Sequence, residues 1–300
     1  MTTIAQPAAA TAPTSAGQAD HGCLVVQGRD RPGIVAAVTA LLQRHGANIT
    51  ALDQHSDDPS GGAFFQRTVF RLPDLAVRVP ALEADLDSLT GQLDLNWELF
   101  DQAAPKRVAI LASKSDHCVL DLLWRQRRGE IPMTVPMVIS NHADLAADVR
   151  NFGVPFIHTP TDATNRDAVE AEHLDLLRGN VDLVVLARYM RILSPGFLEK
   201  IGVPVINIHH SFLPAFIGAA PYRRAHERGV KLVGATAHYV TEDLDEGPII
   251  DQDVARASHR DSVAELVRRG ADVERQVLSR AVLWHCQNRV VRHDKHTIVF

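Results

Sequence analysis

Asn207 and His209 stand two residues apart at the end of a short apolar run, and both side chains can act on a carbonyl group. In an extended chain, a spacing of two places them on the same side. An asparagine amide can donate a hydrogen bond to a carbonyl oxygen, and a histidine can donate to a developing oxyanion or move a proton. A strand end can equally carry a capping asparagine and a packing histidine, so these two residues alone leave both interpretations open.

Asp245 lies in a second polar segment, an acidic loop that separates two apolar runs and ends with Gly247 and Pro248. Acidic loops are usually solvated turns. A glycine two residues after the aspartate, however, allows the backbone to pass close to a ligand. A carboxylate beside a histidine is the smallest apparatus that can activate water. Taken together, the two segments could polarise a carbonyl group and supply it with a nucleophile.

The elements that would position these residues follow from the apolar pattern of the second two-thirds of the chain. From Lys106 onward, short apolar runs alternate with segments of helical periodicity, which predicts an α/β fold with a mostly parallel sheet. The expected strands are residues 108–111, 133–140, 154–158, 181–186 and 205–208. Ligands in such folds bind outside the carboxyl ends of the strands. Asn207 and His209 fall at that edge.

The first third of the chain predicts a separate domain over residues 21–101. Strand-like runs and two helical stripes follow one another there in the order βαββαβ, which is a ferredoxin-like arrangement. Residues 102–105 are expected to form a linker, and residues 106–300 the second domain. Residues 1–20 are expected to form a disordered tail, because they lack the charged and apolar regions of a secretory signal and the arginines of a transit peptide.

The composition excludes several classes of protein. A chain of 300 residues with 46% hydrophobic residues suits two globular domains, and a net charge of −5 argues against bulk nucleic-acid binding. No run approaches the roughly 20 apolar residues of a membrane span. The three cysteines contain no CxxC pair, which indicates free thiols in a reducing compartment and a cytoplasmic protein.

The spacing Asn207-x-His209, Ser211-x-Leu213-Pro214 and Asp245-x-Gly247-Pro248 resembles the formyl transferase family, whose members use 10-formyltetrahydrofolate. The resemblance implies that Asn207, His209 and Asp245 are the catalytic residues. Asp245 would activate water, and Asn207 and His209 would stabilise the tetrahedral intermediate. Residues 186–193 and 240–244 are similar to the segments that hold the pterin ring. They imply a folate-binding set of Met190, Arg191, Ile192, Leu193, Val240, Glu242, Asp243 and Leu244.

Residues 30–35 and 46–49 resemble an ACT domain, a regulatory module that often senses amino acids. This resemblance implies an effector site near Asp30, Arg31, Gly33 and Asn48. The alternative is that the domain only assembles a homo-oligomer, because ferredoxin-like modules can pair edge to edge. An ACT domain followed by a Rossmann-like formyl transferase domain is the architecture of the deformylases of this family. They hydrolyse 10-formyltetrahydrofolate to formate and tetrahydrofolate, which feeds formate to purine synthesis and balances one-carbon pools.

Hydrolysis and transfer of the formyl group to an amine remain two open alternatives. An enzyme that formylates a phosphorylated amine needs a phosphate cradle, usually glycine-rich, after its first strand. Residues 112–117 contain no glycine, which favours water as the acceptor, although Lys114 and Ser115 could still hold an anion. A non-catalytic binding protein is a third interpretation, disfavoured because the catalytic trio is complete. The family often has basic residues where this chain has Ile217 and Ala220.

No metal and no cofactor are predicted, so the folate substrate and water are the small-molecule partners. His210 and His238 beside the catalytic trio could suggest zinc. The chain has no HExxH motif, however, and the trio has roles without a metal. Cys118 follows His117 and could suggest a thiol nucleophile, but a buried thiol near a strand end is the expected structure.

Overall fold

The computed structural model describes residues 20–58, 60–162, 164–214 and 221–300. The predicted tail lies outside these ranges except for Asp20, and Ile217 and Ala220 also lie outside them. The chain divides into two compact units, with the boundary between Ala104 and Pro105. No helix in the described ranges combines the length and the apolar character needed to cross a membrane.

The first unit confirms the βαββαβ order. Its elements are β1 (His21–Arg29), α1 (Ile34–Arg44), β2 (Asn48–Ser56), β3 (Ala63–Arg71), α2 (Leu75–Leu93) and β4 (Leu95–Asp101). The sheet order is β2-β3-β1-β4, with antiparallel pairing throughout. Alternate strand residues such as Leu24 and Phe70 pack against apolar positions of the two helices, among them Val38 and Leu82. The unit is therefore a sheet with both helices on one face.

The second unit is an α/β fold with a mostly parallel sheet, as expected. Its strands are β5 (Lys106–Ala112), β6 (Met133–Thr134), β7 (Val138–Ser140), β8 (Phe156–His158), β9 (Leu183–Ala187), β10 (Val205–His209), β11 (Leu232–Tyr239) and β12 (Ile249–Arg256), and a hairpin of β13 (Val290–His293) and β14 (His296–Val299) follows. The main sheet runs β12-β11-β10-β9-β5-β7-β8. The strands β8, β7, β5, β9 and β10 pair in parallel in that order. At the other edge, β11 and β12 add two antiparallel strands.

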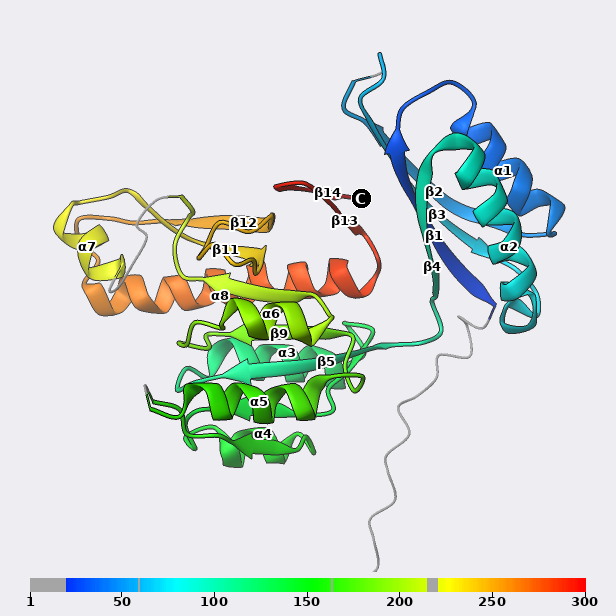
Figure 1. Cartoon of the computed structure of the whole chain (residues 1–300). Coiled ribbons are helices and arrows are strands. Elements are labelled where there is room, and N and C mark those ends of the chain that lie inside the picture. Colours follow the sequence, from blue (N-terminus) through cyan, green and yellow to red (C-terminus); the bar gives the residue numbers. More distant parts are fainter. Residues whose placement is uncertain (1–19, 59, 163, 215–220) are drawn as a thin grey trace, which may run out of the picture. The chain divides into compact units, whose positions relative to one another are not determined.

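Helices cover both faces of this sheet (Figure 1). They are α3 (His117–Arg127), α4 (Ala146–Asn151), α5 (Arg166–Leu177), α6 (Pro195–Ile201), α7 (Pro221–Glu227) and α8 (Val263–Cys286). Alternation along β5 separates two cores. Val108 and Ile110 pack with α3 and α8, whereas Ala109 and Leu111 pack with α5 and α6. This explains why residues 108–112 of β5 are apolar without interruption.

One predicted strand is wrong in its extent. Residues 133–140 form two short strands, β6 and β7, instead of one. Pro136 lies between them, and a proline has no N–H to donate to a neighbouring strand. Both pieces still pair with β5, so the break changes the strand's length but not its position in the sheet.

The strand order locates the edge where a ligand would bind. From β5 the chain moves outward to β7 and β8, then returns to the opposite side of β5 as β9 and continues to β10. Such a reversal leaves a crevice at the carboxyl ends of the strands on either side of it. β9 ends at Ala187 and β10 at His209, so the predicted functional segments begin at this crevice.

Candidate active site

Asn207 and His209 come from β10, which lies between β9 and β11. Ile206 and Ile208 belong to the core on one face of the sheet, so the two polar residues point to the other face. The register pairs Asn207 with Leu186 of β9 and with His238 of β11. This pairing places His238 directly beside Asn207, a proximity that two distant sequence segments do not reveal.

His238 fixes the donor direction of Asn207. Its Nδ1 lies 2.9 Å from the carbonyl oxygen of Tyr239, which can only accept, so Nδ1 carries the proton. Nε2 of the neutral ring then has a lone pair and accepts a hydrogen bond from Nδ2 of Asn207 at 3.2 Å. The second N–H of the same amide is left to donate elsewhere. His238 therefore makes Asn207 a hydrogen-bond donor in the crevice.

Asp245 approaches the two histidines from the loop between β11 and β12. Its Oδ1 lies 3.2 Å from Nδ1 of His209 and 3.7 Å from Nε2 of His238. The hydrogen bond from His209 holds the pKa of Asp245 well below its usual range. Asp245 is thus ionised, and Nδ1 of His209 donates to it. Nε2 of His209 is buried and has no hydrogen-bond partner in the described chain.

Gly247 lies against another backbone segment of the protein. A Cβ atom at this position would lie 1.7 Å from the carbonyl oxygen of Tyr239. The close approach shown by the structure is between two backbone segments of the protein. Only glycine allows the loop to return so close to β11 and bring Asp245 to the histidines.

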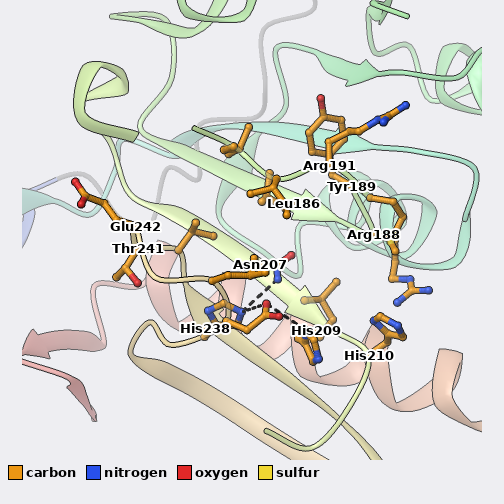
Figure 2. Close-up of a pocket in the computed structure, with 17 residues that line it drawn as sticks. Leu186, Arg188, Tyr189, Arg191, Asn207, His209, His210, His238, Thr241 and Glu242 are labelled. Atoms are coloured by element: carbon orange, nitrogen blue, oxygen red, sulfur yellow. Dashed lines mark hydrogen bonds and ion pairs between the residues drawn. The ribbon is translucent and has the colours of Figure 1, made fainter. Parts of the chain in front are cut away.

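A cavity of about 400 Å³ opens onto these side chains (Figure 2). It is lined by the three predicted catalytic residues and by seven of the eight predicted folate-binding residues, namely Met190, Arg191, Ile192, Leu193, Val240, Glu242 and Leu244. Asp243, the eighth, does not line it. The lining also includes Leu186, Arg188, Tyr189 and Thr241, which lie within the two predicted segments. Ile208, His210 and His238 line it as well and were not among the predicted site residues. The volume is typical of sites for small organic molecules.

Polar side chains from other elements hold the segment that forms one side of this cavity. Ser113, just after β5, accepts a hydrogen bond from the backbone N–H of Met190 at 3.0 Å. Arg166 of α5 donates to the carbonyl oxygen of Ile192 at 3.0 Å. Because Ser113 also donates to Asn141, its hydroxyl is already used by the protein. These bonds give residues 190–192 a defined backbone position.

Thr236 holds the turn that follows the catalytic strand. Its hydroxyl donates to the carbonyl oxygen of Ser211 at 2.9 Å and accepts from the backbone N–H of Leu213 at 3.0 Å. Gln252 of β12 donates to the same hydroxyl at 2.9 Å. The Ser211-x-Leu213 part of the sequence motif is therefore held in a fixed turn directly after His209.

A second buried polar cluster adjoins the cavity. Glu274 of α8 is 2% exposed and accepts a hydrogen bond from Tyr222 of α7 at 2.7 Å. Nε2 of His117 lies 2.8 Å from its other oxygen, and Nε of Arg188 lies 3.4 Å from that oxygen. Burial raises the pKa of Glu274, but its hydrogen bond to His117 and the charge of Arg188 lower it more, so the net pKa is lowered. Glu274 is therefore an ionised carboxylate held by two hydrogen bonds and one ion pair.

The same cluster contains a group of possible metal ligands. Ligand atoms of His117, Cys118 and Glu274 lie within 4.8 Å of one another. Burial raises the pKa of the Cys118 thiol well above its usual value, which makes the thiol a poor metal ligand and a poor nucleophile. Arg188 already supplies a cation to Glu274. The cluster therefore does not suit a metal, and the absence of metal and of any cofactor stays a prediction.

The predicted effector residues do not lie together in one copy of the chain. Asp30, Arg31 and Gly33 form the turn before α1, whereas Asn48 begins β2 after that helix has ended. The helix has 11 residues, or about 16 Å of length. In the sheet, Asn48 pairs with Arg71 at one end of β3, and Arg29 pairs with Ala63 at the other. One amino acid could not contact both groups within a single unit.

Comparison with known proteins gives a consistent result for both units. Residues 106–282 match the family model described as formyl transferase, and residues 24–87 match the ACT domain. A relative from Mycobacterium tuberculosis (strain ATCC 25618 / H37Rv), named formyltetrahydrofolate deformylase, is 64% identical over 283 residues, which is 94% of this chain and 91% of that protein.

Two solved structures show the same fold. A formyltetrahydrofolate deformylase from Pseudomonas syringae has a TM-score of 0.88 and 45% identity, covering 93% of this chain and 94% of that one. A glycinamide ribonucleotide transformylase from Symbiobacterium toebii has a TM-score of 0.63 and 34% identity, covering 68% of this chain and 98% of that one. The similarity to the deformylases therefore extends over nearly the whole chain.

Proposed function

Because the chain belongs to the formyltetrahydrofolate deformylase family within the formyl transferases, we propose that it hydrolyses 10-formyltetrahydrofolate to tetrahydrofolate and formate. The observation that supports this most is the meeting of Asn207, His209 and Asp245 at one cavity with the two predicted folate-binding segments. The pterin would lie along residues 190–193 and 240–244, with the formyl group at the trio.

In the proposed mechanism, His209 moves the proton. Its Nδ1 is committed to Asp245, so Nε2 has the lone pair that can accept a proton from water. The water oxygen bonds to the formyl carbon, and the carbonyl oxygen becomes an oxyanion that receives a hydrogen bond from Asn207. The protonated His209 then gives its proton to N10 as the carbon–nitrogen bond breaks. Formate leaves with the oxygen from water.

Asp245 acts in this scheme through its charge. A carboxylate whose pKa lies well below the usual range is a weak base, so full deprotonation of water by Asp245 is unfavourable. An ionised carboxylate next to Nδ1 instead stabilises the positive charge that His209 gains, and it can orient the attacking water. Asp245 therefore orients the water and stabilises the charge on His209, and it does not itself remove the proton.

The experiment that tests this function needs no acceptor. Purified protein is incubated with 10-formyltetrahydrofolate in buffer alone, and formate is measured with a formate dehydrogenase reaction. We expect catalytic formate release that persists after exhaustive chelation. Formate that appears only after an amine is added would instead identify a formyltransferase. Loss of formate release on chelation, with recovery on adding zinc, would contradict the metal-free mechanism.

For the ACT unit we propose an amino acid as effector, acting in a homo-oligomer. Since the turn at 30–33 and Asn48 lie at opposite ends of α1, a second copy would have to complete the site. Isothermal titration with single amino acids and light scattering test this proposal, and no heat at millimolar ligand would count against a sensor. We further propose a cytoplasmic enzyme that supplies formate to purine synthesis and balances one-carbon pools. The three free, buried cysteines are consistent with such a reducing compartment.

A further inference from the structure

Arg188, Glu274, His117 and Tyr222, here called the charged wall, form a buried network that the proposed mechanism does not use. The four residues come from the segment after β9, from α8, from the start of α3 and from α7. All three partners converge on the Glu274 carboxylate, at 2.7 to 3.4 Å. Bringing an ionised carboxylate and a guanidinium out of water is costly, and such a pair is by itself weak evidence for stability. Its position beside the cavity points to a function.

The charged wall borders the reacting end of the cavity. Arg188 and His210 both line the cavity, and Figure 2 shows the Arg188 side chain extending toward His210, away from Arg191 and the pterin segment. The ring of Tyr222 lies 6.4 Å from that of His210, whose own ring lies 5.3 Å from that of His209. The wall therefore stands on the side of His209 that the folate-binding segments leave open.

At two positions around the charged wall, the residue present is not the one that the local backbone conformation favours. Arg188 has a φ of 60°, in the left-handed region that favours glycine. Gly270 lies within the long helix α8, where alanine would be the better helix former. A Cβ atom at Gly270 would lie 1.9 Å from the Tyr222 hydroxyl. A large residue thus stands where glycine suits the backbone, and a glycine stands where it makes room for Tyr222.

An amine acceptor has different needs from water at this position. It brings a substituent that requires space beside the formyl carbon, whereas water requires room for a single oxygen. The guanidinium of Arg188 repels a protonated amine, and the carboxylate that could attract one is already paired with that guanidinium and hydrogen-bonded to His117 and Tyr222.

We infer that the charged wall is the specificity element that excludes amine acceptors and leaves water as the nucleophile. This inference rests on the proposed function. When the wall is opened, an amine nitrogen can bond to the formyl carbon in place of water. The bond from that carbon to N10 breaks as before, and the amine proton passes to N10.

The test is a competition between water and an amine. Protein is incubated with 10-formyltetrahydrofolate and glycinamide, and formate and N-formylglycinamide are measured together by mass spectrometry. Arg188→Gly removes the guanidinium and suits the positive φ of this position. Asp294→Gly is the matched control, because Asp294 also has a positive φ, of 50°, but lies in the turn between β13 and β14. Tyr222→Ala opens the wall independently from α7.

The wild-type protein and Asp294→Gly should release formate, form almost no N-formylglycinamide and show no inhibition by glycinamide. Arg188→Gly or Tyr222→Ala should raise the ratio of N-formylglycinamide to formate by about tenfold or more, the scale of steric discrimination in pockets. An unchanged ratio in a folded variant overturns the inference, as does amine formylation or inhibition by glycinamide in the wild type. Failure of the wild type to release formate in the absence of amine would overturn the proposed function instead.

Discussion

Asp245→Asn should lower kcat for formate release by about 10⁴-fold. The carboxylate oxygen lies 3.2 Å from Nδ1 of His209. At an effective dielectric constant of about 20, two unit charges at that distance interact with about 5 kcal/mol. The substitution removes this stabilisation from the transition state, in which His209 carries a positive charge. Since each 1.36 kcal/mol corresponds to about a tenfold change in rate, the loss is nearly four powers of ten.

KM should change little in the same variant, because asparagine has nearly the same volume and the apolar lining of the cavity is untouched. The hydrogen bond from His209 keeps the pKa of Asp245 well below its usual range, so the wild-type carboxylate is ionised throughout the range from about pH 5 to 9. The deficit of the variant should therefore be nearly constant over that range.

The assay is steady-state formate release at several pH values, with Asp294→Asn as control. Asp294 has the same left-handed backbone and an exposed side chain, so this control changes the same chemical group outside the cavity. The reasoning is wrong if Asp245→Asn keeps kcat within about tenfold of the wild type. So small a loss would mean that His209 gains no positive charge in the transition state and that the substitution only replaces one hydrogen bond with another.

Four further outcomes follow from the geometry. Asn207→Ala should lower kcat by about 10²–10³-fold, as loss of an oxyanion donor does, and a smaller loss in steady-state kinetics would exclude that role. His238→Ala should cost up to about 10²-fold in kcat by misplacing the Asn207 amide; a loss confined to KM would contradict this. Gly247→Ala should reduce the free energy of unfolding in urea by about 3 kcal/mol or more, because its Cβ would meet the carbonyl oxygen of Tyr239, and a variant as stable as the wild type would refute the close approach. Because the pKa of Asp245 is lowered in the folded chain, its ionised form stabilises the fold above the unfolded pKa of about 3.9. The difference in unfolding free energy between wild type and Asp245→Asn should therefore persist above about pH 4 and disappear as the pH falls further. A difference that grows on acidification would contradict the direction of this pKa shift.

The fold of both units was accessible from the sequence because its signals are local. A run such as residues 108–111 is apolar because both faces of its strand are covered, and that pattern is visible without knowing the partners. The break at Pro136 was also visible, since a proline cannot donate within a strand, but the apolar character on both sides of it dominated the prediction. The topology then placed the polar ends of the strands at one edge.

The missed parts of the site depend on pairings that the sequence does not encode locally. His238 is important because the register of β10 and β11 places it opposite Asn207, and a shift of one residue would turn it to the other face. Glu274 occupies a position in a long amphipathic helix where a charged residue ordinarily faces water. Its partner His117 lies 157 residues earlier in the chain. No periodicity links two such positions, so the charged wall could be found only in the folded chain.

The environments of the three histidines that line the cavity in the described chain give them different proton chemistry. Nδ1 of His238 faces a backbone carbonyl, and its Nε2 is engaged by Asn207, so a proton added there would break the bond that orients the amide. Burial, reinforced by the charge of Arg188, lowers the pKa of His210 to about 4, which keeps that ring neutral near pH 7. His209 alone among these three has a hydrogen-bonded carboxylate at one nitrogen and an unpartnered second nitrogen. Burial and the neighbouring charge of Arg188 thus leave His209, and not His210, as the ring equipped to take the proton in the proposed mechanism.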